Sequence, residues 1–134
     1  MKTCRYCLLP AVLLKFGDKG YPYGADYGPT WTCAPCQAWV GTHPGTENAL
    51  GGLANAELRK AKQAAHAAFD PLWQAKMRRD KCSKGQARRS GYLWLAGQLG
   101  IPFKRCHIGY MNLDECRKVV EVCSAIHSKE TTCQ

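Results

Sequence analysis

The sequence predicts an α+β fold, in which short antiparallel strands at the N-terminus precede a small helical domain. Short apolar segments separated by Gly- and Pro-rich turns fill residues 1–43, and from residue 55 onward apolar residues recur at helical spacing. Two closely spaced cysteine pairs lie within the first segment. We expect an N-terminal module over 1–45, a connector over 46–54 and a helical domain over 55–134.

The two cysteine pairs are Cys4 with Cys7 and Cys33 with Cys36. Four thiolates on two tight turns suit the tetrahedral coordination of Zn²⁺, whereas Mg²⁺ and Ca²⁺ prefer oxygen ligands. A segment of this size buries too little apolar surface to fold alone, so we expect one structural zinc ion to contribute folding free energy. The alternative is two disulfides or buried free thiols. A thioredoxin-like redox site is rejected because no βαβ pattern surrounds either pair.

The strands expected around these turns are short. Residues 11–16 form an apolar segment, followed by turn chemistry at 17–20 and by a Tyr-, Gly- and Pro-rich loop at 21–29. Residues 30–32 and 38–42 then flank the second cysteine turn. Two metal turns backed by three short strands predict a zinc ribbon. His43 follows the last strand, and we expect it to be a loop residue because four cysteines already complete the ligand set.

The first part of the helical domain is predicted from its caps and from one apolar stripe. Asn55 is suited to cap a helix, and four apolar residues then recur at helical spacing: Leu58, Ala61, Ala65 and Phe69. Asp70-Pro71 resembles a cap followed by a first-turn proline. It therefore predicts a chain restart and a second, short helix ending near Arg79.

Two further helices are predicted toward the C-terminus. Ser83 caps one that ends at Gly100, and Asn112 with Glu115 forms a capping box for one over about 113–126. Apolar positions on the first of these predict an ordinary core, and we assign Trp94, beside that stripe, to packing rather than to base stacking. Two late cysteines, Cys116 and Cys123, share a helix face and are expected to be buried, although a second metal site with His107 is the alternative.

The net charge of +9 comes almost entirely from the middle of the chain. Residues 71–113 hold nine basic and one acidic side chain, whereas the segments before and after are close to neutral. We call the seven cations around one predicted turn the basic corner: Lys76, Arg78, Arg79, Lys81, Lys84, Arg88 and Arg89. Lys84, Arg88 and Arg89 lie in the early turns of the helix that Ser83 caps, where the helix dipole makes positive charge mildly unfavourable. Their presence at this position favours an external anionic partner. A solvated basic face is the alternative.

Cysteine usage and the absence of a targeting signal indicate a soluble cytoplasmic protein without a membrane partner. The nine cysteines are an odd number, whereas a secreted disulfide scaffold normally pairs them all. The apolar run 8–14 is short, contains Pro10, and lacks a small-residue cleavage site after it. No other run approaches membrane-spanning length.

Several groups of residues resemble a family of small zinc-finger-containing proteins from bacteriophages and prophages. They are Cys4-x-x-Cys7, Trp31-x-Cys33-x-x-Cys36-x-x-Trp39-Val40-Gly41-x-His43, the run from Ala64 to Trp73, Tyr92-x-Trp94-Leu95-Ala96 and Cys106-His107-Ile108-Gly109. The resemblance covers most of the chain. It implies the four metal ligands and a phage-encoded protein in the host cytoplasm, but no reaction. The turns here carry Leu8 and Gln37 where many zinc ribbons place glycine.

Three functions are compatible with these features. The first is a nucleic-acid-binding accessory protein with a structural zinc ion and the basic corner on phosphate. The second is an interaction module that captures or inhibits a host factor, with an acidic protein on the same corner. The third is a nuclease-like enzyme using His66, Asp70 or His107, which the resembling family shares. Catalysis is disfavoured because four cysteines leave the metal no open position and carboxylates are few.

Overall fold

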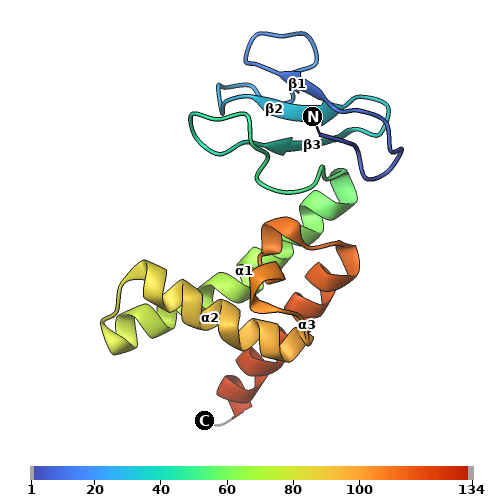
Figure 1. Cartoon of the computed structure of the whole chain (residues 1–134). Helices are drawn as coiled ribbons and strands as arrows, with labels where there is room; N and C mark the ends of the chain where they lie inside the picture. The colour runs from blue at the N-terminus through green and yellow to red at the C-terminus, as the bar shows by residue number, and fades with distance from the viewer. Residues whose placement is uncertain (1, 133–134) are drawn as a thin grey trace. The chain divides into compact units, whose positions relative to one another are not determined.

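The computed structural model describes the backbone of residues 2–132 and the side chains of residues 2–126. The chain divides into two compact units, Met1–Arg59 and Lys60–Gln134, which we call the N-terminal unit and the helical unit. The first holds the strands and the second nearly all of the helices (Figure 1). This arrangement confirms the predicted α+β class. Among the described residues we find no helical segment with the length and hydrophobicity needed to span a bilayer.

The N-terminal unit is built on a three-stranded antiparallel sheet of order β1-β2-β3. The strands are β1 (Val12–Leu14), β2 (Thr30–Cys33) and β3 (Ala38–Gly41), as the sequence predicted. Leu13 pairs with Trp31, which in turn pairs with Val40. The register also places Cys33 opposite Ala38, so the second cysteine turn closes the β2–β3 hairpin.

The loops between β1 and β2 are ordered by local hydrogen bonds and ring contacts. Lys15 N donates to Asp18 Oδ2 at 2.8 Å, and the flanking Gly17 and Gly20 have φ angles of 98° and 93°. Those angles suit glycine and confirm the predicted turn. Edge-to-face contacts then link the tyrosines of the 21–29 loop to one another and to the sheet through the 6.5 Å Tyr23–Trp39 ring contact.

Residues 46–54, expected to be a connector, pair with β3. Leu50 N donates to Gly41 O, and Ala54 exchanges two backbone hydrogen bonds with Trp39. Leu53 is fully buried in the same apolar cluster as Cys4 and Cys33. The cluster that surrounds the cysteine turns therefore includes a side chain from this segment.

The chain restart predicted at Asp70-Pro71 is wrong, because α1 (Ala56–Asp80) is one continuous helix with Pro71 inside it. Asn55 caps it as predicted, with Oδ1 accepting from Leu58 N at 3.0 Å. Asp70 is not a cap: its Oδ1 accepts from Trp73 Nε1 at 3.0 Å. Pro71 is exposed, so the helical hydrogen bond that its missing N–H cannot make is lost at the surface.

The other two helices have the predicted caps. For α2 (Lys84–Leu99), Ser83 and Gln86 form a capping box and Gly100 closes the helix in a left-handed conformation at φ 68°. Two short 3₁₀ turns, η1 (Phe103–Arg105) and η2 (Ile108–Tyr110), lead to α3 (Leu113–Thr132). Asn112 and Glu115 exchange the expected capping hydrogen bonds, and α3 continues beyond the predicted end near residue 126.

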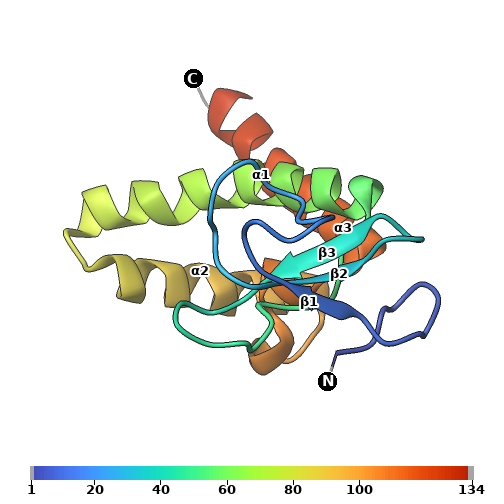
Figure 2. The ribbon, with the colours of Figure 1, turned by 90° about the horizontal axis from the view of Figure 1, so that it is seen from above.

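The core of the helical unit lies among its three helices and the 3₁₀ turns. Figure 2 shows α1 and α2 side by side, joined through residues 81–83. Their packing centres on Phe69 and Tyr92, whose rings are 4.7 Å apart. Buried residues from every part of the unit complete it: Ala65, Ala87, Leu95, Cys106, Ile108, Met111, Cys116, Val119 and Cys123. The expectation that the late cysteines of the last helix are buried is thereby confirmed for Cys116 and Cys123.

Candidate metal centre and basic corner

The first cysteine turn is a backbone loop closed on itself. Leu8 N donates to Cys4 O, and Cys4 N donates to Leu9 O, both at 2.9 Å. These bonds reverse the chain so that Cys4 and Cys7 face the same side. The reversal requires a positive φ at Leu8, which is 64°. A leucine holds the conformation that glycine adopts more readily.

The second cysteine turn, at the tip of the β2–β3 hairpin, also has a residue with a positive φ directly after its second cysteine. Gln37 N donates to Ala34 O at 3.1 Å, and Gln37 has a φ of 50°. Cys33 is buried at the end of β2, whereas Cys36 is half-buried in the turn. Both departures from the glycine pattern thus fall at positions where the backbone is left-handed.

The four thiols converge on one point. Their Sγ atoms all lie within 4.8 Å of one another, and Cys7 Sγ is 3.7 Å from Cys33 Sγ. A tetrahedral site with Zn–S bonds of about 2.3 Å needs sulfur separations near 3.8 Å. The cluster therefore fits one zinc ion, held by the four predicted ligands: Cys4, Cys7, Cys33 and Cys36. All four thiols are unpaired in the structure, which favours metal over the disulfide alternative.

The electrostatics of the cluster call for a cation. Burial, together with hydrogen bonds among the thiols, raises the pKa of Cys36 to about 12. For Cys4 burial acts in the same direction but is outweighed by hydrogen bonds from the backbone of Cys7 and Tyr6, which bring its pKa to about 7. Four neighbouring thiols cannot all ionise without a bound positive charge. Zinc supplies that charge and leaves no open position for water, so its role is structural.

The other metal candidates stay outside this cluster. His43 is exposed, and its backbone N donates to Asn48 O in the following turn. Among the described side chains, the four cysteines form the one group of three or more metal-binding residues. A second metal site built on His107 and the late cysteines is therefore absent from residues 2–126.

The candidate acid–base residues occupy two separate settings. His66 Nδ1 lies 3.5 Å from the carboxylate of Asp70, which already accepts a hydrogen bond from Trp73. His107 lies instead between the rings of Tyr92 and Tyr110, at centroid distances of 5.2 and 5.8 Å. None of the structure's described contacts joins His107 to the His66–Asp70 pair.

The basic corner spans the end of α1, the connecting turn and the first turns of α2. Six of its seven side chains are exposed, and Lys76 is half-buried. Asp80 is the one acidic residue between them, contacting Lys76 Nζ at 2.7 Å and Arg79 Nε at 3.3 Å. The remaining five have no carboxylate partner among the described residues: Arg78, Lys81, Lys84, Arg88 and Arg89.

Aromatic rings support the α2 side of the corner. Lys84 Nζ and the Arg88 guanidinium each lie 5.9 Å from the ring of Trp73, and the Arg89 guanidinium lies 5.0 Å from that of Phe103. These contacts place three cations near aromatic rings, and all three residues remain exposed. The sequence analysis did not connect Trp73 with the corner. The available signal was the spacing of Lys84 and Arg88, which are one helical turn apart and therefore lie on the same face of α2.

In a comparison with known proteins, a single family model covers both the N-terminal unit and most of the helical unit. A family model described as a zinc-finger-containing domain matches residues 1–126. No curated protein and no solved structure gives a significant match.

Proposed function

Because this chain belongs to the family of zinc-finger-containing domains, with a structural zinc site in its N-terminal unit, we propose that it is an accessory protein that binds nucleic acid. In this proposal the zinc ion stabilises the fold and the basic corner of the helical unit contacts phosphates.

The observation that supports this function is the excess of free positive charge at the basic corner. Five of its seven cations have no carboxylate partner among the described residues, and Asp80 is shared by the other two. Cations at a helix start oppose the helix dipole, so Lys84 in the first turn of α2 weakens that helix slightly. An anionic partner removes this penalty. A phosphate backbone, with one charge per nucleotide, suits a row of cations better than a single carboxylate does.

The setting we propose is the reducing cytoplasm of a bacterial host, with the protein encoded by a phage or prophage. The resemblance to phage proteins supports the origin. The compartment is supported by the free thiols of Cys106, Cys116 and Cys123, which are buried in the helical core rather than paired.

The proposal is tested by titrating the zinc-loaded chain against labelled single- and double-stranded DNA and RNA over a salt series. If the corner neutralises four or five phosphates, log K falls against log salt with a slope of about −3 to −4.5. A slope near zero, or no binding at about 50 mM salt, overturns the proposal.

Charge reversal locates the interface. We expect Arg78→Glu, Arg79→Glu, Arg88→Glu and Arg89→Glu together to abolish binding. The matched control reverses four exposed lysines elsewhere: Lys15, Lys19, Lys60 and Lys118. It changes the net charge equally, so it should retain most of the affinity, and equal losses in both variants would show that only overall charge matters. Circular dichroism checks that both remain folded.

An acidic protein is the competing partner for the same cations. Polyglutamate of matched length and charge separates the two, because it lacks the phosphate spacing and the bases. Binding of polyglutamate as tight as that of the nucleic acids would favour the protein-interaction function instead.

A further inference from the structure

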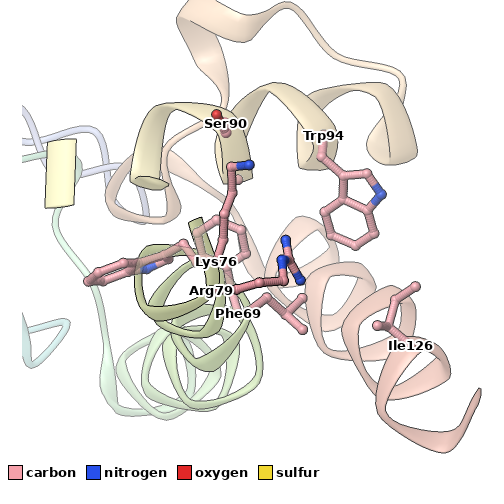
Figure 3. A pocket seen from close by; sticks show the side chains of 9 residues that line it. Phe69, Lys76, Arg79, Ser90, Trp94 and Ile126 are labelled. Atoms are coloured by element: carbon pink, nitrogen blue, oxygen red, sulfur yellow. The ribbon is translucent and has the colours of Figure 1, made fainter. Parts of the chain in front are cut away.

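A cavity of about 360 Å³ opens beside the basic corner, between the end of α1, the middle of α2 and Ile126 of α3. Its size is at the lower end of the range for small-molecule sites, about 300–1,000 Å³. Figure 3 shows Arg79 reaching across from α1 toward Trp94, which projects from α2, with Ile126 beyond it. All of its lining residues belong to the helical unit.

The walls of the cavity are mainly apolar and aromatic. Phe69, Leu72, Trp73, Trp94 and Ile126 line it, and Trp94 is only half-buried. The indole nitrogen of Trp73 is already bonded to Asp70, so this ring offers an apolar surface rather than a free donor. The sequence analysis assigned Trp94 to packing, but its ring borders an open space.

Small residues on α2 shape this space. A Cβ atom at Gly91 would lie 3.0 Å from Phe69 Cζ and 3.4 Å from Trp73 Cβ, so glycine permits the close approach of α2 to α1. Ser90 lines the cavity next to it. Larger side chains at these two positions would fill the space between the aromatic walls.

The polar side chains that line the cavity are cationic or small. Lys76 and Arg79 line it directly, and both belong to the basic corner. Lys84 and Arg88 lie over the Trp73 ring, which also lines the cavity. A ligand matching these walls carries a flat ring for the tryptophans and anionic groups for the cations. A nucleotide has both.

We propose that this cavity receives an unpaired base, stacked on Trp94, while the flanking phosphates contact Lys76 and Arg79. The inference rests on the proposed function and narrows its ligand to single-stranded nucleic acid. Bases in a duplex are paired and stacked inside the helix, so they cannot enter. A base bound through its ring face is held with little regard to sequence, because every base has such a face.

The test compares two single-stranded oligonucleotides of equal length, one of thymidines and one in which every position is abasic. Both carry the same phosphates, so charge alone binds them equally. Stacking of one base predicts about 5- to 150-fold tighter binding of the thymidine strand. In Trp94→Ala this ratio should fall to near one while affinity for the abasic strand is unchanged, and Trp94→Phe should retain most of the ratio.

Two further variants guard against a folding defect. Ser90→Leu fills the cavity without removing an aromatic ring and should lower the ratio in the same way. Leu93→Ala removes an exposed apolar side chain next to Trp94 that does not line the cavity, so the ratio should remain that of the wild type.

The outcomes distinguish the two proposals. Equal wild-type affinity for the abasic and thymidine strands overturns the cavity assignment and leaves phosphate binding by the corner intact. The assignment is also overturned if Trp94→Ala and Ser90→Leu both keep the wild-type ratio of thymidine-strand to abasic-strand affinity, because the bases then bind outside the cavity. If neither strand binds at about 50 mM salt while duplex DNA or RNA does, the cavity assignment fails and the proposed function stands; if none of these nucleic acids binds, the proposed function itself fails.

Discussion

Leu8 and Gln37 occupy equivalent places in the two cysteine turns: each directly follows the second cysteine of its pair, and each has a positive φ. The angles are 64° and 50°. Two independent turns therefore use a backbone conformation that costs an L-residue roughly 1–2 kcal/mol. That conformation is set by the need to point both thiols of a pair toward one metal.

Replacing either residue by glycine should stabilise the zinc-loaded protein. Leu8 is 75% exposed, so Leu8→Gly loses little burial and relieves the left-handed strain. We expect the free energy of unfolding to rise by about 0.5–1 kcal/mol after the entropic cost of glycine is included. Urea unfolding in excess zinc measures it. Leu9→Gly is the matched control, because Leu9 is also exposed but is not left-handed. It should destabilise, and a Leu8→Gly protein no more stable than wild type would contradict the argument.

Removing the metal should unfold the N-terminal unit and leave the helical unit folded. The cluster around the sheet consists largely of the ligands themselves with a few small or aliphatic side chains and Trp31, whereas the helical unit has its own core. A strong chelator should abolish the near-ultraviolet signal of Trp31 and Trp39 while most of the helical far-ultraviolet signal remains.

Single substitutions identify the ligands in the same experiment. Cys36→Ser should reduce bound zinc well below one ion per chain in elemental analysis, whereas Cys82→Ser, outside the cluster, should not. Full zinc occupancy in Cys36→Ser would exclude the four-cysteine site.

The thiols should differ sharply in reactivity. Burial raises the pKa of Cys123 to about 11, and burial together with the charge of Glu115 does the same for Cys106. Against an ordinary value of 9.0, their thiolate fraction at neutral pH is lowered about 100-fold. Because the thiolate is the reactive form, their alkylation should rise with pH up to about 11.

Site-resolved mass spectrometry after alkylation at pH 8 tests this order. Cys82, which is half-buried in the turn between α1 and α2, should label first. The four ligands should label only after chelation. Labelling of Cys106 or Cys123 as fast as Cys82 would show that the helical core opens readily.

The features predicted correctly from the sequence are those set by local chemistry. Asn55, Ser83 and Asn112 are caps because their side chains bond to backbone N–H groups within three residues, and Gly100 ends α2 by its own conformation. The metal ligands follow from spacing alone. Each of these signals needs no knowledge of distant residues.

The features that were missed depend on tertiary contacts. Asp70-Pro71 has the local pattern of a helix start, but the apolar faces on both sides of it pack against one core, which favours one continuous helix. Leu53 looked like part of a connector because its burial depends on the cysteine cluster 17 or more residues away. The cavity beside Trp94 arises only when α1, α2 and α3 are assembled.

The continuity of α1 predicts the effect of replacing its proline. In the interior of a helix, proline lacks a donor and is unfavourable by up to about 3 kcal/mol relative to alanine. Pro71→Ala should therefore stabilise the helical unit by about 1–3 kcal/mol, seen as a higher midpoint in thermal unfolding. At a helix start the same change would be neutral or unfavourable, because proline suits the first turn. Gln74→Ala, exposed on the same helix, is the control and should change stability only slightly.

Asp80 restrains the basic corner, and its removal should strengthen nucleic-acid binding. Hydrogen bonds from Lys76 and Arg79 hold the pKa of Asp80 below its usual 3.8, so it is ionised throughout the neutral range. It therefore repels phosphates and occupies the two cations that line the cavity. Asp80→Asn should raise affinity for single-stranded DNA roughly two- to fivefold at about 50 mM salt, and less at higher salt. Asp26→Asn in the N-terminal unit makes the same change in net charge and should have little effect. An equal gain from both variants would show that only net charge matters, and a loss from Asp80→Asn would mean that the pairs with Asp80 position these cations for binding.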